Sequence, residues 1–377
     1  MSRDKRGVIG RATRATAAAL LVIVAAGTSL GCATLTGRPG SSDIVILDPP
    51  EQGFFTKQLM CHDIPIKSHA VVDDKALLEA HRRLSEQLGR APNIAYNLAQ
   101  AGAELHIIGK DQVTSDLPYL RHYRGKPYGG GEQTIDERTR GVGGLAASCG
   151  EENLLKLPSD RYKFHRDICR HEFAHTILTY ALPKEIQDMV RAQYKKSTDE
   201  GKWKTAYAAS NYHEYFAEMT MWYFGSRGAY GRIEPPPVEG TEWLKGYDPE
   251  GYELLDKIYS GQLPVERVTS FVDLSAQPLD KESDLRSGDS AVETNIRFEN
   301  RTANEYEMFW VDAEGKRKSY GKLQPGGKHG QRTSAGHVWL IVDDQGQTVN
   351  IFAAQDKAGR AIIRESVDTT ATGLANQ

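Results

Sequence analysis

The sequence predicts an α+β protein in which a mainly helical domain precedes a small all-β sandwich. Two observations carry this prediction: apolar residues recur at helical spacing in the middle of the chain, and short alternating runs fill its C-terminal part. With 377 residues, the chain is long enough for two domains that each bury a core. Its formal net charge of -3 provides no electrostatic footprint for nucleic acid, so we expect no DNA or RNA partner.

The N-terminal segment predicts export. A basic start, MSRDKRGVIGRATR, precedes the apolar stretch TAAALLVIVAAGTSLGC, which is too short for a comfortable membrane span. The ending SLGC resembles a bacterial lipobox, with Ser29 where that pattern usually has Leu, and implies a lipid on Cys32. We expect a signal peptide over residues 1–31, a tether over 32–45 and a protein held at the cell envelope through Cys32. The alternatives are a cleaved soluble signal and an uncleaved anchor.

Four helices and one strand are expected within residues 46–274. The first helix is indicated by leucines at helical spacing between an aspartate cap and a glycine stop: Asp73 or Asp74, Leu77, Leu84, Leu88 and Gly89. Longer helices are expected at about 162–181, 183–196 and 204–224, and AELHIIGK is a strand candidate. The stretch YRGKPYGGGEQTIDERTRGVGG has too many glycines for either element, which indicates a loop near something that needs close backbone approach.

The C-terminal part changes pattern after a polar linker, SAQPLDKESDLRSGDS, at residues 275–290. The runs TNIRFEN, YEMFWVD, HVWLIVD and TVNIFAA then alternate between apolar and polar residues, with polar turns between them. This spacing predicts a β-sandwich over residues 291–363. We expect residues 364–377 to form a disordered tail.

The motif HEFAH, residues 171–175, indicates a metal site. On a helix, positions i and i+4 share a face, so His171 and His175 would present two imidazoles to one metal ion. Glu172 would reach a water molecule bound to that metal. A catalytic zinc needs a third protein ligand and keeps its fourth position open for water. The metzincin pattern is excluded, because its downstream glycine and histidine positions hold Leu178 and Ala181.

The third ligand is expected in AYAASNYHEYFAEM. Glu214 would complete a site of two histidines and one glutamate that holds one Zn²⁺ per chain. Glu218, one turn on, would accept the free ring N–H of a ligand histidine, and Asn211 lies on the same stretch as a further supporting residue. His213 is a rival ligand, but an adjacent residue points about 100° around the helix.

Two further roles follow from these positions. Zinc would lower the pKa of its water toward about 7, and Glu172 would take the proton. Tyr207, on the same helical stripe as Glu214, would donate its phenolic proton to the oxyanion that forms on a polarised carbonyl. The expected reaction is hydrolysis of an amide.

HEFAH followed by YAASNYHEYFAE resembles the lethal-factor-type gluzincin metallopeptidases, whose motif is HEFxH with a later Tyr, six residues and E-x-F-A-E. The resemblance covers about 60 residues, and at the x of E-x-F-A-E this chain has Tyr215 where the family usually has Phe. It implies a zincin-type metallopeptidase domain over residues 46–274. The matching positions are His171, Glu172, His175, Tyr207, Glu214 and Glu218.

The run from IRFEN to IVDDQG looks like the β domain of the von Hippel-Lindau family, through its FxNRT, WVDxEG, LxPG and GHxWL elements. Members of that family bind a hydroxyproline in a shallow pocket, so the resemblance implies a peptide-binding module. Its pocket residues would be Trp310, Tyr320, Thr333, His337 and Trp339. Arg332 stands where the family has a histidine, which makes the same ligand doubtful. No counterpart of the segment that recruits a ubiquitin ligase follows, so we expect no ligase assembly.

Three functions are consistent with these observations. The first is an exported zinc endopeptidase that acts on a protein or peptide and carries a β module for binding it. The second is an envelope-anchored binding protein with a structural or idle metal site, and the third is a zinc amidase that acts on cell-wall peptides. A structural zinc site uses four protein ligands and needs no general base, whereas three ligands and Glu172 are found.

Overall fold

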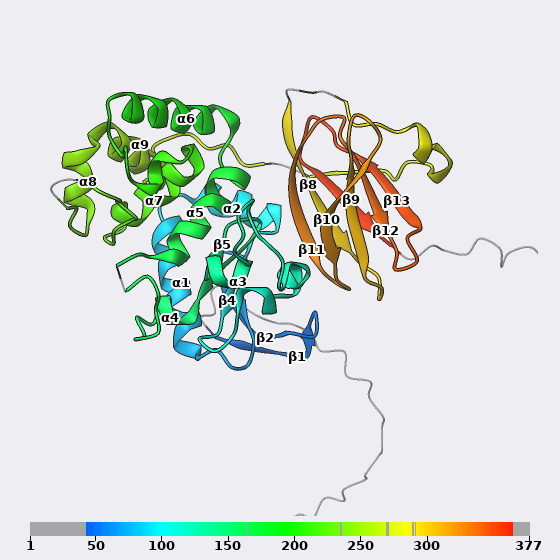
Figure 1. The fold of residues 1–377 in the computed structure, drawn as a ribbon, viewed down its shortest axis with the longest axis horizontal. Helices are drawn as coiled ribbons and strands as arrows, with labels where there is room; N and C mark the ends of the chain where they lie inside the picture. The colour runs from blue at the N-terminus through cyan, green and yellow to red at the C-terminus, as the bar shows by residue number, and fades with distance from the viewer. Residues whose placement is uncertain are drawn as a thin grey trace, which may run out of the picture. The chain divides into compact units, whose positions relative to one another are not determined.

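The computed structural model describes residues 43–163, 165–233, 236–268, 271–288, 290 and 292–364. The expected signal peptide, Cys32, most of the expected tether and the tail from residue 365 lie outside these residues. Within the part described, no helix is both long and apolar enough to cross a membrane. The α+β prediction is confirmed: helices and a mixed sheet are followed by a β-sandwich (Figure 1).

The first domain is built on a six-stranded sheet with the order β1-β2-β3-β4-β6-β5. Its strands are β1 (Val45–Glu51), β2 (Phe55–Cys61), β3 (Ile64–Ser68), β4 (Glu104–Ile108), β5 (Gly141–Val142) and β6 (Ala146–Gly150). Strands β3, β4 and β6 run parallel, and the other neighbours pair antiparallel. The strand expected at AELHIIGK is β4, inside the sheet, and β5 forms one edge.

The helical elements of this domain are α1 (Asp74–Leu88), α2 (Pro92–Ala101), η1 (Thr114–Asp116), η2 (Pro118–Tyr123), α3 (Ile135–Arg138), α4 (Glu151–Leu154), α5 (Ile168–Tyr180), α6 (Lys184–Asp199), η3 (Tyr207–Ala209), α7 (Tyr212–Tyr223), α8 (Thr241–Tyr247) and α9 (Pro249–Tyr259). The first expected helix is confirmed as α1, which Asp73 caps and Gly89 ends. The helix expected from Pro183 is α6. The glycine-rich stretch before residue 145 is mostly loop, as expected.

Strand β4 separates two apolar layers. Leu105 and Ile107 belong to the main core, which they share with α1, α2 and α5. Ile108 belongs to a second core, together with Phe55 and residues of η2 and α3. Because successive strand residues point to opposite faces, α1, α2 and α5 cover one face of the sheet, and η2 and α3 cover the other.

A buried ion cluster lies at the start of β4. The Lys67 Nζ donates to Glu104 Oε2 at 3.0 Å, and His106 Nε2 lies 2.9 Å from the same oxygen. Burial alone raises the pKa of the Glu104 carboxyl, but the hydrogen bond with His106 and the charge of Lys67 outweigh burial and lower this pKa to about 2. The ionised Glu104 therefore stabilises the folded sheet.

We expect Glu104→Gln to destabilise the protein by about 3 kcal/mol at neutral pH and to flatten the acid side of its stability curve. The folded-state pKa of Glu104 lies below its unfolded value, so its contribution is present above pH 4.5 and is lost as the pH falls toward 2. Urea unfolding across this pH range measures both effects. Glu185→Gln, at an exposed position of α6, is the matched control. If the free energy of unfolding of Glu104→Gln fell between pH 4.5 and 2 as steeply as that of the parent, the prediction would be contradicted.

Two expected helices begin later in the structure than the sequence suggested. The helix expected from 162 begins at Ile168, because Lys163 has a left-handed φ of 54° and Asp167 caps the helix by accepting the Arg170 N–H. The helix expected over 204–224 is interrupted, which corrects the single stripe proposed for Tyr207 and Glu214. Asn211 has an extended backbone and caps α7, and Tyr207 lies before it in η3.

The C-terminal module is a sandwich of two four-stranded sheets with the orders β10-β9-β12-β13 and β11-β8-β14-β7. Its strands are β7 (Val272–Asp273), β8 (Glu293–Asn300), β9 (Tyr306–Val311), β10 (Arg317–Leu323), β11 (Lys328–Ser334), β12 (Val338–Val342), β13 (Thr348–Ala353) and β14 (Gly359–Ile363). The four expected runs are β8, β9, β12 and β13. Strand β14 runs parallel to β8 and β7, and the remaining pairs are antiparallel.

The stretch expected as a polar linker, 275–290, contacts the sandwich. Just before it, β7 pairs with β14, and the Leu274 side chain is buried in the sandwich core. Near its end, the Ser287 Oγ accepts the Val338 N–H at 2.9 Å and donates to the Val311 carbonyl. Residues 272–288 therefore pack as part of the β module as well as connecting it.

Candidate metal centre and cleft

Helix α5 carries HEFAH, and its first turn is held by buried charges. The Asp167 Oδ1 accepts the Arg170 N–H at 3.0 Å and also the Arg83 Nη1–H of α1 at 2.7 Å. All three side chains are buried. The aspartate thus caps the helix and ties its start to α1, which fixes the direction in which His171 and His175 point.

Helix α7 supplies the carboxylate. The Asn211 Oδ1 accepts the N–H groups of His213 and Glu214 at 2.9 and 3.0 Å, so the helix begins at Tyr212. Asn211 therefore supports the candidate centre by orienting the first turn of α7. Because α7 packs against α5, Glu214 faces the two histidines.

Three donor atoms form a nearly equilateral triangle. The Nε2 atoms of His171 and His175 are 3.3 Å apart, and Glu214 Oε2 lies 3.2 Å from the first and 3.5 Å from the second. With bonds of about 2.0–2.1 Å, the ligand atoms of tetrahedral zinc lie roughly 3.3–3.4 Å apart. The triangle therefore fits one face of a zinc coordination sphere, and these are the three residues that group as possible metal donors in the described part of the chain.

Charges around the triangle favour a cation. Burial alone lowers the pKa of His171, but hydrogen bonds with Glu214 and Glu218 outweigh it and raise this pKa to about 10. Burial alone raises the pKa of Glu214, but hydrogen bonds with His171 and His175 outweigh it and hold this pKa well below its usual range. The carboxylates thus stabilise positive charge at this position, and a metal ion would compete with a proton for it.

Glu218 lies behind His171 and is fully buried. Its Oε1 is 3.2 Å from His171 Nδ1 and accepts the Arg166 Nη2–H at 2.6 Å. Its other oxygen accepts the Ala229 N–H. Glu218 therefore lies where it can accept the ring N–H of His171 and fix which nitrogen faces the triangle.

Glu172 lines the same cleft, which has a volume of about 750 Å³. Its side chain is nearly buried, and burial raises the pKa of its carboxyl against the opposing charges of His171 and His175. A carboxyl with a raised pKa is better matched to proton transfer than a solvated one.

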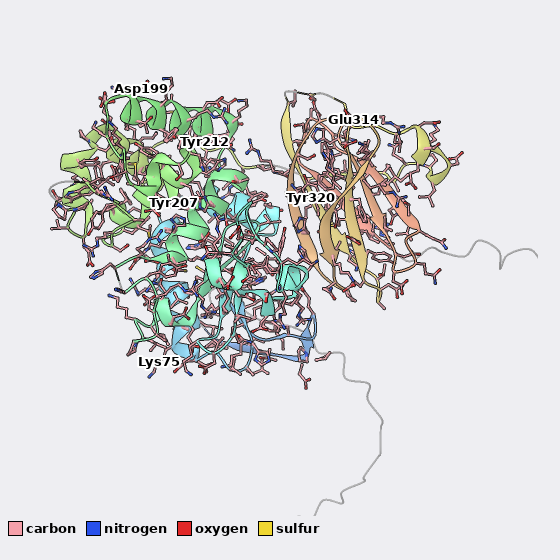
Figure 2. All side chains as sticks on the ribbon, viewed as in Figure 1. Lys75, Asp199, Tyr207, Tyr212, Glu314 and Tyr320 are labelled. Atoms are coloured by element: carbon pink, nitrogen blue, oxygen red, sulfur yellow. The ribbon has the colours of Figure 1, made fainter. Side chains whose placement is uncertain are left out.

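Tyr207, labelled in Figure 2, reaches the triangle although it lies outside α7. Its hydroxyl donates to Glu214 Oε1 at 3.2 Å, and its ring stacks on the His171 ring at a centroid distance of 6.5 Å. Burial and the Glu214 charge raise the pKa of the Tyr207 phenol to about 12, so it is a proton donor at neutral pH. The side chain is 42% exposed, which leaves it accessible from the cleft.

His213, the rival ligand, does not belong to the donor group. Its ring lies tilted against that of Tyr212 at a centroid distance of 4.1 Å, and burial lowers its pKa to about 4. His213 lines the same cleft, but its direction on α7 differs from that of Glu214 and it stays outside the donor triangle.

The residues expected to form the β-module pocket also come together. They surround a cavity of about 240 Å³ that Arg332 and Ser334 also line. The Thr333 Oγ1 lies 3.0 Å from His337 Nδ1 and accepts the Trp339 Nε1–H at 3.1 Å. Tyr320, labelled in Figure 2, stands edge-on to Trp339 at 4.8 Å.

The two tryptophans of this pocket differ in burial. Trp339 is buried in the sandwich core, so its main role is structural. Trp310 is partly buried, and its ring lies 5.2 Å from that of His337. Of the two, Trp310 is the one available to a ligand.

Two supporting residues of the metal centre were not found from the sequence. Arg166 pairs with Glu218 and also lines the cleft. Arg83, on α1, binds the Asp167 cap from a position 84 residues earlier in the chain. Helical spacing around HEFAH contains no signal for either contact, because both depend on packing. The Asp167 cap itself is a local signal that the sequence contained.

Fold and site together define an α+β domain with a candidate metal centre of two histidines and one glutamate, followed by a β-sandwich module. Residues 285–355 match the family model of the VHL beta domain, which confirms the resemblance of the C-terminal run to that domain. A search of curated proteins finds no match. Among solved structures, the Pro-Pro endopeptidase PPEP-2 from Paenibacillus alvei is similar at 18% identity and a TM-score of 0.36, over 50% of this chain and 92% of that one.

Proposed function

We propose that this protein is an exported zinc-dependent endopeptidase of the lethal-factor-type gluzincin kind, with a C-terminal β module that binds protein or peptide. The main support is the triangle of His171, His175 and Glu214 donor atoms with Glu172 in the same cleft. The fit of the triangle to zinc rests on its edge lengths of 3.2, 3.3 and 3.5 Å.

Each residue then has a defined task. Zinc, when bound, supplies a Lewis acid that polarises a peptide carbonyl and lowers the pKa of a water molecule. The Glu172 carboxylate accepts the proton of the attacking water and passes it to the leaving amine. The Tyr207 hydroxyl turns from Glu214 and donates to the oxyanion as it develops. Glu218 holds His171 in the tautomer that directs Nε2 into the cleft.

The arrangement favours a hydrolase over a binding protein with a structural metal site. A structural zinc site is closed by four protein ligands, whereas the described residues offer three donors and a buried carboxyl beside them. This argues against a binding protein with a purely structural metal. A zinc amidase for cell-wall peptides would use the same residues, so it remains the second candidate and differs only in substrate.

The remaining parts of the proposal rest on the sequence. Export and anchoring through a lipid on Cys32 follow from the N-terminal segment. The β module contributes a pocket with Trp310, Tyr320 and His337 that suits a peptide.

The deciding experiment is metal analysis of the purified protein together with digestion of a mixed peptide library. The proposal expects about one zinc ion per chain, and cleavage that a chelator stops and added zinc restores. Digestion of cell-wall peptides in parallel separates the endopeptidase from the amidase. A parent protein that binds no zinc would refute both hydrolase functions.

Tyr207→Phe tests the oxyanion donor. We expect kcat to fall about 10²-fold while KM and zinc content stay close to those of the parent, because the hydroxyl acts in the transition state. Steady-state kinetics and metal analysis on one preparation measure the three quantities. Tyr96→Phe, which changes a tyrosine outside the cleft, is the control. A rise in KM without a fall in kcat would assign Tyr207 to substrate binding instead.

A further inference from the structure

One cation of the cleft has no acidic partner. Two arginines line the cavity, Arg138 and Arg166. Arg166 is paired with Glu218 at 2.6 Å. Arg138 makes no ion pair with any residue that the structure describes, and its Nη1 donates only to the carbonyls of Tyr128 and Gly129, at 3.4 and 3.3 Å.

The nearby carboxylates are already engaged. Asp136 accepts both the N–H and the hydroxyl of Ser115 at 2.7 Å. Glu137 accepts the N–H and the hydroxyl of Thr134 at 2.8 and 2.9 Å, which closes the capping box of α3. The short helix α3 therefore uses both of its acidic residues in local structure and leaves its arginine to face the cleft.

The glycine-rich loop makes room for this guanidinium. Gly129 has a φ of 65°, and a Cβ at that position would lie 2.5 Å from Arg138 Nη1. Only glycine allows the backbone to come this close without strain. This is the close approach that the glycine content of the stretch indicates.

Arg138 lines the same cavity as the candidate metal donors. The lining of this cleft includes Arg138 together with His171, His175 and Glu214. A substrate that occupies the cleft beside these donors would therefore meet the guanidinium.

We propose that Arg138 is a specificity-determining residue that binds the side-chain carboxylate of an Asp or Glu near the scissile bond of the substrate. The inference rests on the proposed peptidase function and adds the substrate class, an acidic peptide. A guanidinium with free donors pairs with a carboxylate through charge-assisted hydrogen bonds, and its planar fork can hold both carboxylate oxygens.

The test compares quenched fluorescent peptides that are identical except for Glu or Gln at one position, moved in turn around the scissile bond. All peptides are amidated at the C-terminus, so that the side chain is the only variable carboxylate. The parent is expected to prefer Glu at one position by about tenfold in kcat/KM, mostly through KM. Arg138→Gln should reduce this ratio to about one, and Arg138→Glu should invert it.

Two further variants separate charge recognition from loop structure. Gly129→Ala keeps every charge but displaces the guanidinium, so it should also reduce the ratio. Arg161→Gln is the matched control, because Arg161 donates to the carbonyls of Asp136 and Glu137 at 3.3 and 2.9 Å and does not line the cleft. It should retain the full preference of the parent for Glu.

Binding gives a readout that does not depend on turnover. Fluorescence anisotropy of labelled Glu and Gln peptides, measured with full-length Glu172→Gln protein, should show the same preference in Kd, and Arg138→Gln in that background should abolish it. A parent that cleaves peptides without preferring Glu at any position overturns the inference alone. If Arg138→Gln lowers kcat/KM equally for the Glu and Gln peptides, the inference is overturned too. A parent that cleaves nothing and binds no zinc overturns the proposed function first.

Discussion

Glu172→Gln is expected to keep about one zinc ion per chain while peptide cleavage falls by about 10²-fold or more, the scale for loss of a general base. The substitution preserves the shape of a nearly buried side chain and leaves the donor atoms of His171, His175 and Glu214 in place. The amide cannot accept the proton of the attacking water. Metal analysis and steady-state kinetics on one preparation measure both effects.

The matched control is Glu185→Gln, which makes the same chemical change at an exposed position of α6. It should leave zinc content and kcat/KM as in the parent. If Glu172→Gln cleaves peptides as fast as the parent, the peptidase proposal fails, and the envelope-anchored binding protein becomes the better explanation of the metal centre.

His175→Ala is expected to lose zinc and activity together. Removing one of three donors leaves His171 and Glu214, 3.2 Å apart, as the remaining ligands, and two ligands hold zinc far more weakly than three. The result differs from that of Glu172→Gln, in which zinc remains and only activity falls. The measurement is zinc content after dialysis, followed by an assay with and without added zinc.

His165→Ala controls for the loss of any histidine. The His165 ring is half exposed, pairs with Glu239 at 2.8 Å and lies outside the cleft. This variant should keep its zinc. A His175→Ala protein that retained about one zinc ion per chain would show that other residues bind the zinc.

The sequence predicted the parts of the site that depend on one helix. His171 and His175 are one turn apart, so their common face follows from helical geometry alone. Their nitrogens indeed lie 3.3 Å apart in α5. For Glu214, the sequence indicated only that its carboxylate would complete a known ligand set. The packing of α7 on α5 brings this carboxylate to the two histidines.

The prediction from the sequence was wrong where a polar side chain binds backbone N–H groups and interrupts a helix. A continuous helix from 204 to 224 was expected because the apolar spacing runs through Asn211. In the structure, the Asn211 amide oxygen binds the backbone N–H groups of the following turn and starts a new helix there. Asparagine favours such caps, and periodicity alone does not detect them.

Strands β10 and β11 were missed for a related reason. Most of their side chains are exposed or only partly buried, so they lack both the alternation of β8 and the continuous apolar run of β12. Their hydrogen bonds to β9 and β8 hold them in the sheets. Backbone pairing leaves no trace in the sequence when neither face of a strand is strongly apolar.

By itself, the sequence determined the α+β class, the shared helical face of His171 and His175 and the likeness of the C-terminal run to the VHL beta domain, because these depend on local spacing and on residue type. Only the tertiary structure decided how the donors are held. The Arg83 contact with the cap of α5, the Arg166 contact with Glu218 and the place of Arg138 in the cleft join segments distant in the chain. Such contacts form only when separate elements pack together. Periodicity in the sequence indicates single helices and strands, and it does not indicate which of them will pack against each other.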